Sequence, residues 1–285
     1  MLGIVVVVYK SYQDTVRFIK TEISKISTPF KLVIVDNGAT MAESRKLAES
    51  CGAELVVNQN TADKNKDIFL ISTSENLGYA KGNNLGTSFL NQHFAVDYIL
   101  FSNNDIVLKD VEVCDKLIDR LDKTENVGMV GPRVIGSRQE DQSPHYEIKF
   151  IRYFAWVILP FLKGKIKFLR KNRDNSPAEL SEGYCYWVSG CFFMLRKKDF
   201  MDAGMFDSNT FLYGEEKILA ERLLGIGKYS YYDPSVVVFH EHGNTTKKHI
   251  KNKQIEKMVF DSDCYYFREY KHISPIFLNI LKLFN

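Results

Sequence analysis

Several features that would assign this 285-residue sequence to a specialised class are missing from it. Its five cysteines are odd in number and form no CxxC pair, which argues against a disulfide framework and for free thiols in a reducing compartment. The apolar start at 2–8 follows no basic residue, which favours a buried strand over a secretory signal. A later apolar run, 154–162, is interrupted by Pro160, whereas a membrane-spanning helix needs about 20 residues. We therefore expect a cytoplasmic protein that is soluble or attached to a surface.

An excess of one charge is also missing. The chain has 38 Lys and Arg against 35 Asp and Glu, a net charge of +3, which is too balanced for a general nucleic-acid binder. Hydrophobic residues make up 45% and aromatic residues 13%, enough for a sizeable core, so disorder and fibrous repeats are excluded. The length allows one large domain or two small ones.

The first half contains a regular alternation of apolar, strand-like runs and amphipathic, helix-like stretches. Predicted strands lie at 3–8, 31–35, 53–57, 97–101 and 127–130, with 68–71 as a further strand or an irregular loop, and predicted helices at 12–24, 41–50, 79–92 and 111–122. This alternation implies right-handed βαβ units and a mainly parallel sheet covered on both faces. The second half predicts strands at 184–195 and 236–240, helices at 197–203 and 215–224, and one or two helices over 253–283.

Polar residues follow three of the predicted strands. They are Tyr9-Lys10-Ser11, Asp36-Asn37-Gly38 and Ser102-Asn103-Asn104-Asp105. Parallel sheets bind ligands at the carboxyl ends of their strands, where Asp36 can accept hydrogen bonds from a base or ribose. Asp105 suits Mg²⁺ or Mn²⁺, which bridge diphosphate oxygens. Each segment taken alone is also consistent with a simple turn or helix cap.

The stretch Glu75-Asn76-Leu77-Gly78-Tyr79-Ala80-Lys81-Gly82-Asn83-Asn84 leads into the helix at 79–92. Its two glycines allow the backbone to approach a ligand closely, and Lys81 at a helix start can meet a phosphate. The stretch is not GxGxxG, and the first strand also lacks that motif. A dinucleotide-binding Rossmann site is therefore disfavoured.

Two segments of the second half carry candidate catalytic groups. Glu215-Glu216 starts a predicted helix, where the carboxylates either complement the helix dipole or supply a general base. His240 and His242 flank Glu241 at the end of the last predicted strand. A lone His is more often structural, but this arrangement also fits an ion or phosphate contact.

In this order, eight segments resemble glycosyltransferase family 2, the inverting enzymes of GT-A fold, and especially its bacterial rhamnosyltransferase-like members. They are Val7-Val8-Tyr9-Lys10-Ser11, Val35-Asp36-Asn37-Gly38, Asn76 to Asn84, Phe101-Ser102-Asn103-Asn104-Asp105, Trp187-Val188-Ser189-Gly190, Gly204-Met205-Phe206-Asp207, Phe211-Leu212-Tyr213-Gly214-Glu215-Glu216 and Val238-Phe239-His240. The resemblance covers residues 3–245, apart from a basic, aromatic insert. It implies an α/β GT-A fold with a Rossmann-like, mainly parallel sheet, a nucleotide-sugar donor, a divalent metal and transfer with inversion.

The resemblance also implies residue roles. Val8 and Tyr9 would line the nucleobase pocket and Asp36 would contact the base or ribose. Asp105 falls on the metal-binding Asp of the DXD-like motif, and His240 on a histidine that assists the ion. The remaining nucleotide-sugar-binding residues would be Asn76, Gly78, Lys81, Gly82, Asn83, Asn103 and Asn104, and the acceptor-binding residues Trp187 and Asp207.

Two departures from the family pattern bear on these roles. Glu216 stands where the family usually has Asp and is one methylene longer, so Glu215 stays open as the base. Asn103-Asn104-Asp105 replaces the usual Asn-Pro-Asp but keeps the metal-facing Asp. The resemblance therefore implies Mn²⁺ or Mg²⁺ as cofactor and Glu216 or Glu215 as general base.

These roles divide the chain into a GT-A domain at 1–245 and a helical tail at 246–285. Within the domain, 1–135 is the nucleotide-sugar-binding half, 146–173 the insert and 180–245 the acceptor and catalytic half. The insert has eight Lys and Arg against Glu147 alone, interleaved with aromatic residues. It either lies in an anionic lipid interface, with 273–284 as a second apolar contact, or packs on the core with a solvated basic face.

The resemblance, together with the basic, aromatic insert, thus implies an inverting transferase that moves rhamnose or another hexose to a saccharide acceptor linked to a lipid diphosphate, in bacterial surface polysaccharide synthesis. Such an enzyme would be peripheral on the inner face of the cell membrane. A sugar-1-phosphate nucleotidyltransferase is disfavoured because no Gly-rich basic loop follows the first strand. A non-catalytic scaffold subunit of the same fold is disfavoured because the candidate metal and base residues are all retained.

Overall fold

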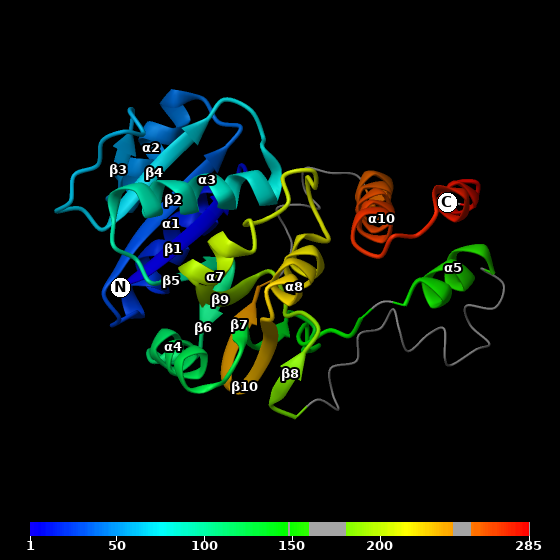
Figure 1. Cartoon of the computed structure of the whole chain (residues 1–285). Helices are drawn as coiled ribbons and strands as arrows, with labels where there is room; N and C mark the ends of the chain where they lie inside the picture. Colours follow the sequence, from blue (N-terminus) through cyan, green and yellow to red (C-terminus); the bar gives the residue numbers. More distant parts are fainter. Residues whose placement is uncertain (148, 160–180, 242–251, 285) are drawn as a thin grey trace.

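The computed structural model describes residues 1–147, 149–159, 181–241 and 252–284, which form a central sheet with helices on both faces (Figure 1). The strand order is β3-β4-β2-β1-β5-β9-β7-β10-β6, and β8 pairs with β10. The strands are β1 (Leu2–Val8), β2 (Phe30–Asn37), β3 (Glu54–Val56), β4 (Ile68–Thr73), β5 (Tyr98–Ser102), β6 (Ile106–Leu108), β7 (Val127–Gly136), β8 (Gly183–Cys185), β9 (Phe192–Arg196) and β10 (Tyr229–His240).

Parallel pairing dominates the N-terminal half. β1 lies between β2 and β5, and β4 lies between β2 and β3, all in parallel. β7 and β10 are also parallel, whereas β9 runs antiparallel to β5 and β7, and β6 and β8 run antiparallel to β10. The sheet is therefore mixed but mainly parallel, as the sequence predicts.

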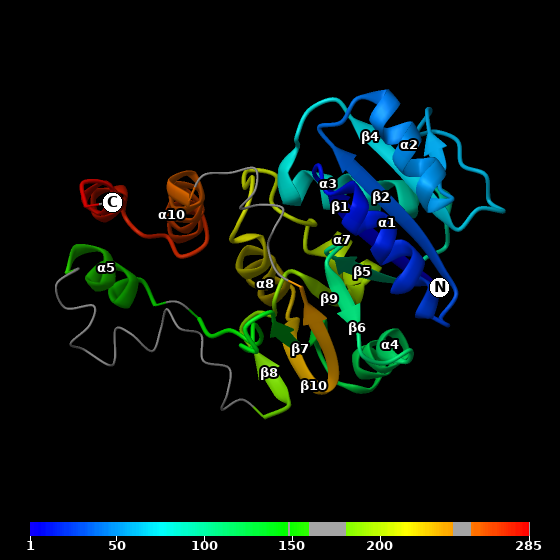
Figure 2. The ribbon, with the colours of Figure 1, turned by 180° about the vertical axis from the view of Figure 1, so that it is seen from behind.

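Helices cover the two faces of the sheet with separate apolar clusters (Figures 1 and 2). One cluster joins the sheet to α1, α2 and α4, and the other joins it to α3, α7 and α8. The helices of the domain are α1 (Tyr12–Thr21), α2 (Met41–Cys51), α3 (Gly78–His93), α4 (Val113–Lys123), α7 (Lys197–Asp202) and α8 (Glu215–Gly225), with a 3₁₀ turn η1 (Ile23–Lys25). Burial of both sheet faces explains why β1 is apolar throughout.

Two strand predictions differ from the structure, and one strand was not predicted. The single strand predicted at 184–195 is wrong, because β8 and β9 pair with different neighbours and are joined by a loop in which Val188 is buried. The prediction at 236–240 found only the end of β10, whose register with β7 shifts between Asp233 and Val237, around Pro234. Strand β6 was not predicted, because its three residues are too few to form a recognisable hydrophobic pattern.

The C-terminal helices form a third apolar cluster with the start of the insert. These helices are α5 (Phe150–Ile158), α10 (Asn252–Glu269) and α11 (Pro275–Lys282). Phe150 and Tyr153 of α5 contact the ring of Phe267 on α10. Two tail helices are present as expected, but the insert from 160 to 173, with most of its cations, lies outside the described residues. No described helix is long and apolar enough to cross a bilayer.

Candidate active site

Polar residues gather at one edge of the sheet. The carboxyl ends of β1, β2 and β5 meet there because these strands are parallel. The start of β9 lies at the same edge, since Phe192 is opposite Ser102 of β5. The loop before β9 therefore faces the strand ends that carry the candidate donor-binding residues.

Asp36 at the end of β2 is fully buried. Its Oδ2 accepts a hydrogen bond from Ser44 Oγ at 2.7 Å, whereas its Oδ1 has no partner among the described residues. Burial raises the pKa of Asp36 to about 6. Because buried polar atoms are normally paired, this Oδ1 fits a donor group of a base or ribose.

The two predicted nucleobase residues of β1 differ in exposure. Val8 is fully buried in the apolar cluster beneath the sheet, so its side chain packs in the core and does not face a nucleobase pocket. Tyr9 is partly exposed, with the Lys10 ammonium 5.2 Å from its ring centre. The side chain of Tyr9 is therefore accessible for contact with a nucleobase.

Asn37, which the sequence did not single out as a site residue, organises the loop before α3. Its Nδ2 donates to Asn76 Oδ1 at 3.0 Å and to the Gly78 carbonyl at 3.1 Å, and its Oδ1 accepts from Leu77 N–H at 2.9 Å. Gly78 has a φ of +79°, and a methyl group there would lie 2.3 Å from the Phe211 carbonyl oxygen. Glycine is therefore required where this loop meets the segment before α8.

The next residues of α3 serve mainly packing. A methyl group on Gly82 would lie 3.0 Å from Val7 of β1, so close helix–strand contact accounts for this glycine. Asn83 is buried and donates to the Tyr79 carbonyl at 3.0 Å. Lys81 is exposed. Of these three predicted donor-binding residues, Lys81 is the one whose side chain can reach a phosphate.

The two asparagines after β5 point to different partners. Asn104 is buried, and its Nδ2 donates to Ser11 Oγ and Thr15 Oγ1, both at 2.7 Å. Its side chain thus fastens the end of β5 to α1 and is not directed at a donor. Asn103 Nδ2 lies 3.5 Å from His240 Nε2.

Asp105 and His240 lie together, as expected for the candidate metal site. His240 Nε2 is 3.1 Å from Asp105 Oδ1, and His240 Nδ1 is 2.8 Å from Gln142 Oε1. Burial opposes protonation of this histidine, but Cys191 and the hydrogen bond to Asp105 together raise its pKa to about 10. Gln142 gave no sequence signal, because the segment before the insert has no recognisable pattern.

This pair fits a divalent ion only in part. A carboxylate oxygen and an imidazole nitrogen are both Mn²⁺ ligands, and two protein ligands leave positions for diphosphate oxygens. Among the described residues, no group of three or more His, Cys, Asp or Glu side chains could hold a metal. His242 lies outside the described residues. A metal here would therefore depend on the substrate for most of its ligands.

Glu215 and Glu216 begin α8. Glu215 is 1% exposed and its Oε1 has no hydrogen-bond partner among the described residues, whereas Glu216 is only half-buried. Burial raises the pKa of both carboxyls, and the charge of Glu216 raises that of Glu215 further. A general base must reach an acceptor hydroxyl. The partial exposure of Glu216 therefore favours it over Glu215, which is 1% exposed.

Gly190, at the turn before β9, makes room for Glu216. A methyl group on Gly190 would lie 1.7 Å from Glu216 Oε1. The carbonyl of Gly190 accepts a hydrogen bond from the Tyr79 hydroxyl at 2.7 Å. Burial, with the charges of the two glutamates, raises the pKa of Tyr79 well above its usual value, so this hydroxyl stays protonated. The sequence contained Gly190 in a motif but gave no sign of this contact.

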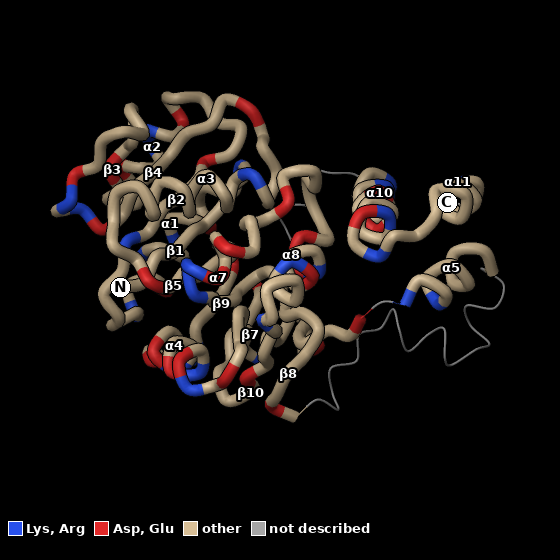
Figure 3. The backbone as a smooth tube through the Cα atoms, in the orientation of Figure 1, with Lys and Arg blue, Asp and Glu red and all other residues tan. Residues whose placement is uncertain are grey.

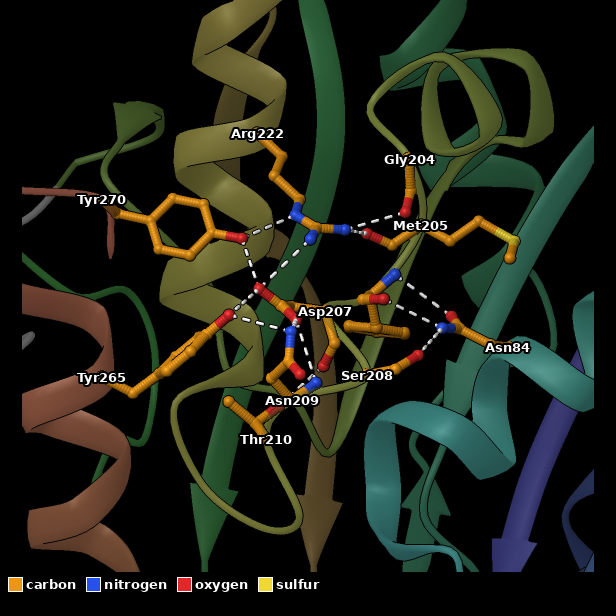
Figure 4. Close-up of polar contacts among 11 residues, drawn as sticks. Asn84, Gly204, Met205, Asp207, Ser208, Asn209, Thr210, Arg222, Tyr265 and Tyr270 are labelled. Carbon is orange, nitrogen blue, oxygen red and sulfur yellow. Dashed lines mark hydrogen bonds and ion pairs between the residues drawn. The ribbon is translucent and has the colours of Figure 1, made fainter. Parts of the chain in front are cut away.

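The two predicted acceptor-binding residues are engaged within the protein. Trp187 stacks on His145, with ring centres 4.0 Å apart. Asp207 is 3% exposed and accepts hydrogen bonds from Tyr265 at 2.8 Å and Tyr270 at 2.6 Å, beside Arg222 at 3.2 Å (Figure 4). Figure 4 shows these side chains converging from α8 and the C-terminal region on the Asp207 loop. Asp207 therefore fastens the C-terminal helices to the domain and has no free oxygen facing an acceptor.

A pocket of about 360 Å³ lies between the loop before α8 and the C-terminal helices. Phe211 and Leu212 form one wall, and Leu278 and Lys282 of α11 belong to another. Thr210, whose hydroxyl donates to the Asp207 carbonyl at 3.0 Å, also lines it. The pocket thus borders the segment that carries the two glutamates.

The sheet and its polar edge define an α/β protein of the GT-A class. Two solved structures support this: GalNAc-T7 with UDP, GalNAc and Mn²⁺ (TM-score 0.58, 13% identity, 85% of this chain and 44% of that one) and the Pyrobaculum calidifontis mannosyltransferase PcManGT with GDP-Man and Mn²⁺ (TM-score 0.57, 12% identity, 99% and 68%). At these identities the likeness concerns the fold alone. The profile of Glycosyl transferase family 2 matches residues 3–202, and the chain belongs to this family.

Its relatives within the family are distant. The rhamnosyltransferase WbbL of Escherichia coli K12 is 26% identical over 167 residues, 57% of this chain and 60% of WbbL. The N-acetylglucosaminyl-diphospho-decaprenol L-rhamnosyltransferase of Mycobacterium tuberculosis is 24% identical over 259 residues, 86% of this chain and 78% of that protein. The chain thus spans less than two thirds of WbbL.

Proposed function

We propose that this chain is an inverting glycosyltransferase that moves rhamnose or another hexose from a nucleoside-diphosphate sugar to a hydroxyl of a saccharide acceptor. The observation that carries the proposal is the half-buried Glu216 at Gly190. The same sheet edge holds the Asp105–His240 pair and Asp36, whose Oδ1 has no partner within the described part of the chain. A donor site and a base at one edge are what a single displacement requires.

In this reaction Glu216 is the general base. The acceptor oxygen forms a bond to the anomeric carbon as the bond from that carbon to the diphosphate oxygen breaks, and the hydroxyl proton passes to Glu216. Burial raises the pKa of this carboxyl and so strengthens it as a proton acceptor. No covalent intermediate is needed.

Asp36 binds the base or ribose through Oδ1, and the loop at 76–78, held by Asn37, covers the diphosphate. Lys81 faces the phosphates. Asp105 and His240 would hold Mn²⁺ or Mg²⁺, which when bound offsets charge on the leaving diphosphate.

For the acceptor we propose a saccharide linked to a lipid diphosphate, used in bacterial surface polysaccharide synthesis at the inner face of the cell membrane. The name of the Mycobacterium tuberculosis relative, which specifies a diphospho-decaprenol acceptor, and the net charge of +7 over 146–173 support this. Because anionic lipids attract Lys and Arg, that segment favours a membrane position.

The test is transfer from a panel of nucleotide sugars by wild type, Glu216→Gln and the exposed control Glu49→Gln. Glu216→Gln should lower the turnover about 10²–10⁴-fold while thermal stabilisation by the donor nucleotide persists, because only proton transfer is lost. Glu49→Gln should match wild type. Full activity of the Glu216→Gln variant would rule out Glu216 as the general base. A protein that neither transfers sugar nor responds to any nucleotide would support the scaffold alternative.

A further inference from the structure

Large apolar side chains are exposed on α5 and on the segment containing α11. Ile151 is 80% exposed on α5, and on the second segment the exposed fractions are 70% for Ile276, 49% for Phe277, 81% for Leu283 and 55% for Phe284. We refer to these five residues as the α5–α11 face. The two helices are neighbours, because Phe277 contacts the rings of Phe150 and Phe154 of α5 at 6.4 and 6.0 Å. Exposed apolar surface of this kind marks an interaction site.

The two segments that carry this face contain cations and no acids. Residues 149–158 contain Lys149 and Arg152 and no acid, and 273–284 contain Lys282 and no acid. Figure 3 shows basic residues at the start of α5 and no acidic residue on α5 or α11. Acids close to these segments are engaged in ion pairs: Glu147 with Lys271 at 2.8 Å, and on α10 Asp263 with Lys217 and Asp261 with Lys257 at 2.5 Å. In sequence, 160–173 adds six more Lys and Arg and no acid.

We infer that the α5–α11 face docks on an anionic lipid bilayer. Apolar side chains rimmed by cations fit the acyl boundary and headgroups of such a membrane. α5 has nine residues and α11 eight, so both suit helices lying in the interface plane. A protein partner is disfavoured because Lys is depleted at protein interfaces.

The docked orientation places the membrane beside the acceptor half. α10 packs against α5 and is joined to α8 by the buried Lys217–Asp263 ion pair. The 360 Å³ pocket has Leu278 and Lys282 of α11 on one side and the loop before Glu215 on another. This step rests on the proposed function: an acceptor with its lipid in the bilayer would present its head group near this pocket.

The test measures co-sedimentation of the full chain with phosphatidylglycerol or phosphatidylcholine vesicles. Wild type should prefer phosphatidylglycerol, and Ile276→Glu/Leu283→Glu should bind it at least about tenfold more weakly, because carboxylates are unfavourable in the interface. Val57→Glu is the matched control, since Val57 is 79% exposed beyond β3. It should bind like wild type. Lys149→Gln/Lys282→Gln should weaken only the preference for phosphatidylglycerol.

Unchanged vesicle binding by Ile276→Glu/Leu283→Glu would overturn the inference. So would self-association of wild type that this double variant abolishes in light scattering, since the face would then join two copies. Nucleotide-induced thermal stabilisation is measured in parallel and should be equal in all variants. A protein that binds vesicles through this face but shows no nucleotide response would contradict the proposed function while leaving the docking surface supported.

Discussion

The two halves of the active-site edge are built in different ways. In the donor half (1–135), Asp36 and Asn37 end the parallel strand β2 and Asp105 lies in the turn after β5, so the chain order alone puts them at one edge. In the acceptor half, Glu215 and Glu216 follow a loop with positive φ at Met205, Tyr213 and Gly214, and side chains from distant helices hold that loop. The donor half therefore depends on backbone pairing, and the acceptor half depends on long-range side-chain contacts.

The largest effect should come from breaking the contact between α8 and α10. Lys217→Met would leave the buried Asp263 carboxylate without its partner, which should lower the free energy of unfolding by about 3–5 kcal/mol. Adding Asp263→Leu should restore much of this loss, and the exposed control Lys198→Met should change nothing measurable. Denaturant titration of the four proteins checks this. Equal stability of Lys217→Met and wild type would mean that the two helices are held by apolar contacts alone.

Gly190→Ala should disable the acceptor half while sparing the donor half. The added methyl group would displace Glu216, and misplacing a catalytic group by about 1 Å can cost about 10²-fold in turnover. Nucleotide-induced stabilisation should stay as in wild type. Gly225→Ala is the control, because nothing lies within 4 Å of a methyl group there. Full turnover of Gly190→Ala would show that catalysis does not depend on the observed position of the Glu216 carboxylate.

Asp36→Asn should remove the pH dependence of the unfolding free energy that comes from burial of the Asp36 carboxyl. The pKa of Asp36 is raised from 3.8 to about 6, so the folded state holds this proton more tightly than the unfolded chain. The resulting stability is present below about pH 4 and is lost as the pH rises through 6. Between these pH values, the unfolding free energy of Asp36→Asn should gain about 2 kcal/mol relative to wild type. Parallel pH curves for the two proteins would contradict this.

The smallest effect is expected from a local contact of the donor half. Thr40 caps α2, and Glu43 completes the capping box. Thr40→Ala should cost about 1 kcal/mol of unfolding free energy and leave turnover unchanged. Thr40→Ser, which keeps the hydroxyl, should restore the stability. A loss of turnover without a loss of stability would show that α2 affects the site directly.

The same difference explains what the sequence could predict. Apolar runs with polar ends identified the donor-half strands β1, β2, β3, β5 and β7, and placed Asp36 and Asp105 at strand ends, because both signals are local. They left β4 open between a strand and a loop, and they missed β6. The strand predicted at 184–195 failed since its apolar residues belong to two strands and a buried loop. Asn104 and Asp207 lie in motifs, but their burial and partners depend on segments far away in sequence.

The roles of Asn37, Gln142 and Gly190 could not be predicted for a related reason. Each acts through contacts with residues in another part of the chain, and no periodicity in the sequence indicates such contacts. Motif recognition supplied the identity of Glu216 but not the space that Gly190 leaves for it.

The contact of Gly78 and Tyr79 with Phe211 has a consequence for protein engineering. The Tyr79 N–H donates to the Phe211 carbonyl at 2.9 Å, and no side chain fits at Gly78. A chimera that exchanges the donor half for that of another family member would therefore bring a foreign loop against this carbonyl. Recombination boundaries should keep residues 76–79 and 205–214 from the same parent, although some 130 residues of chain separate them.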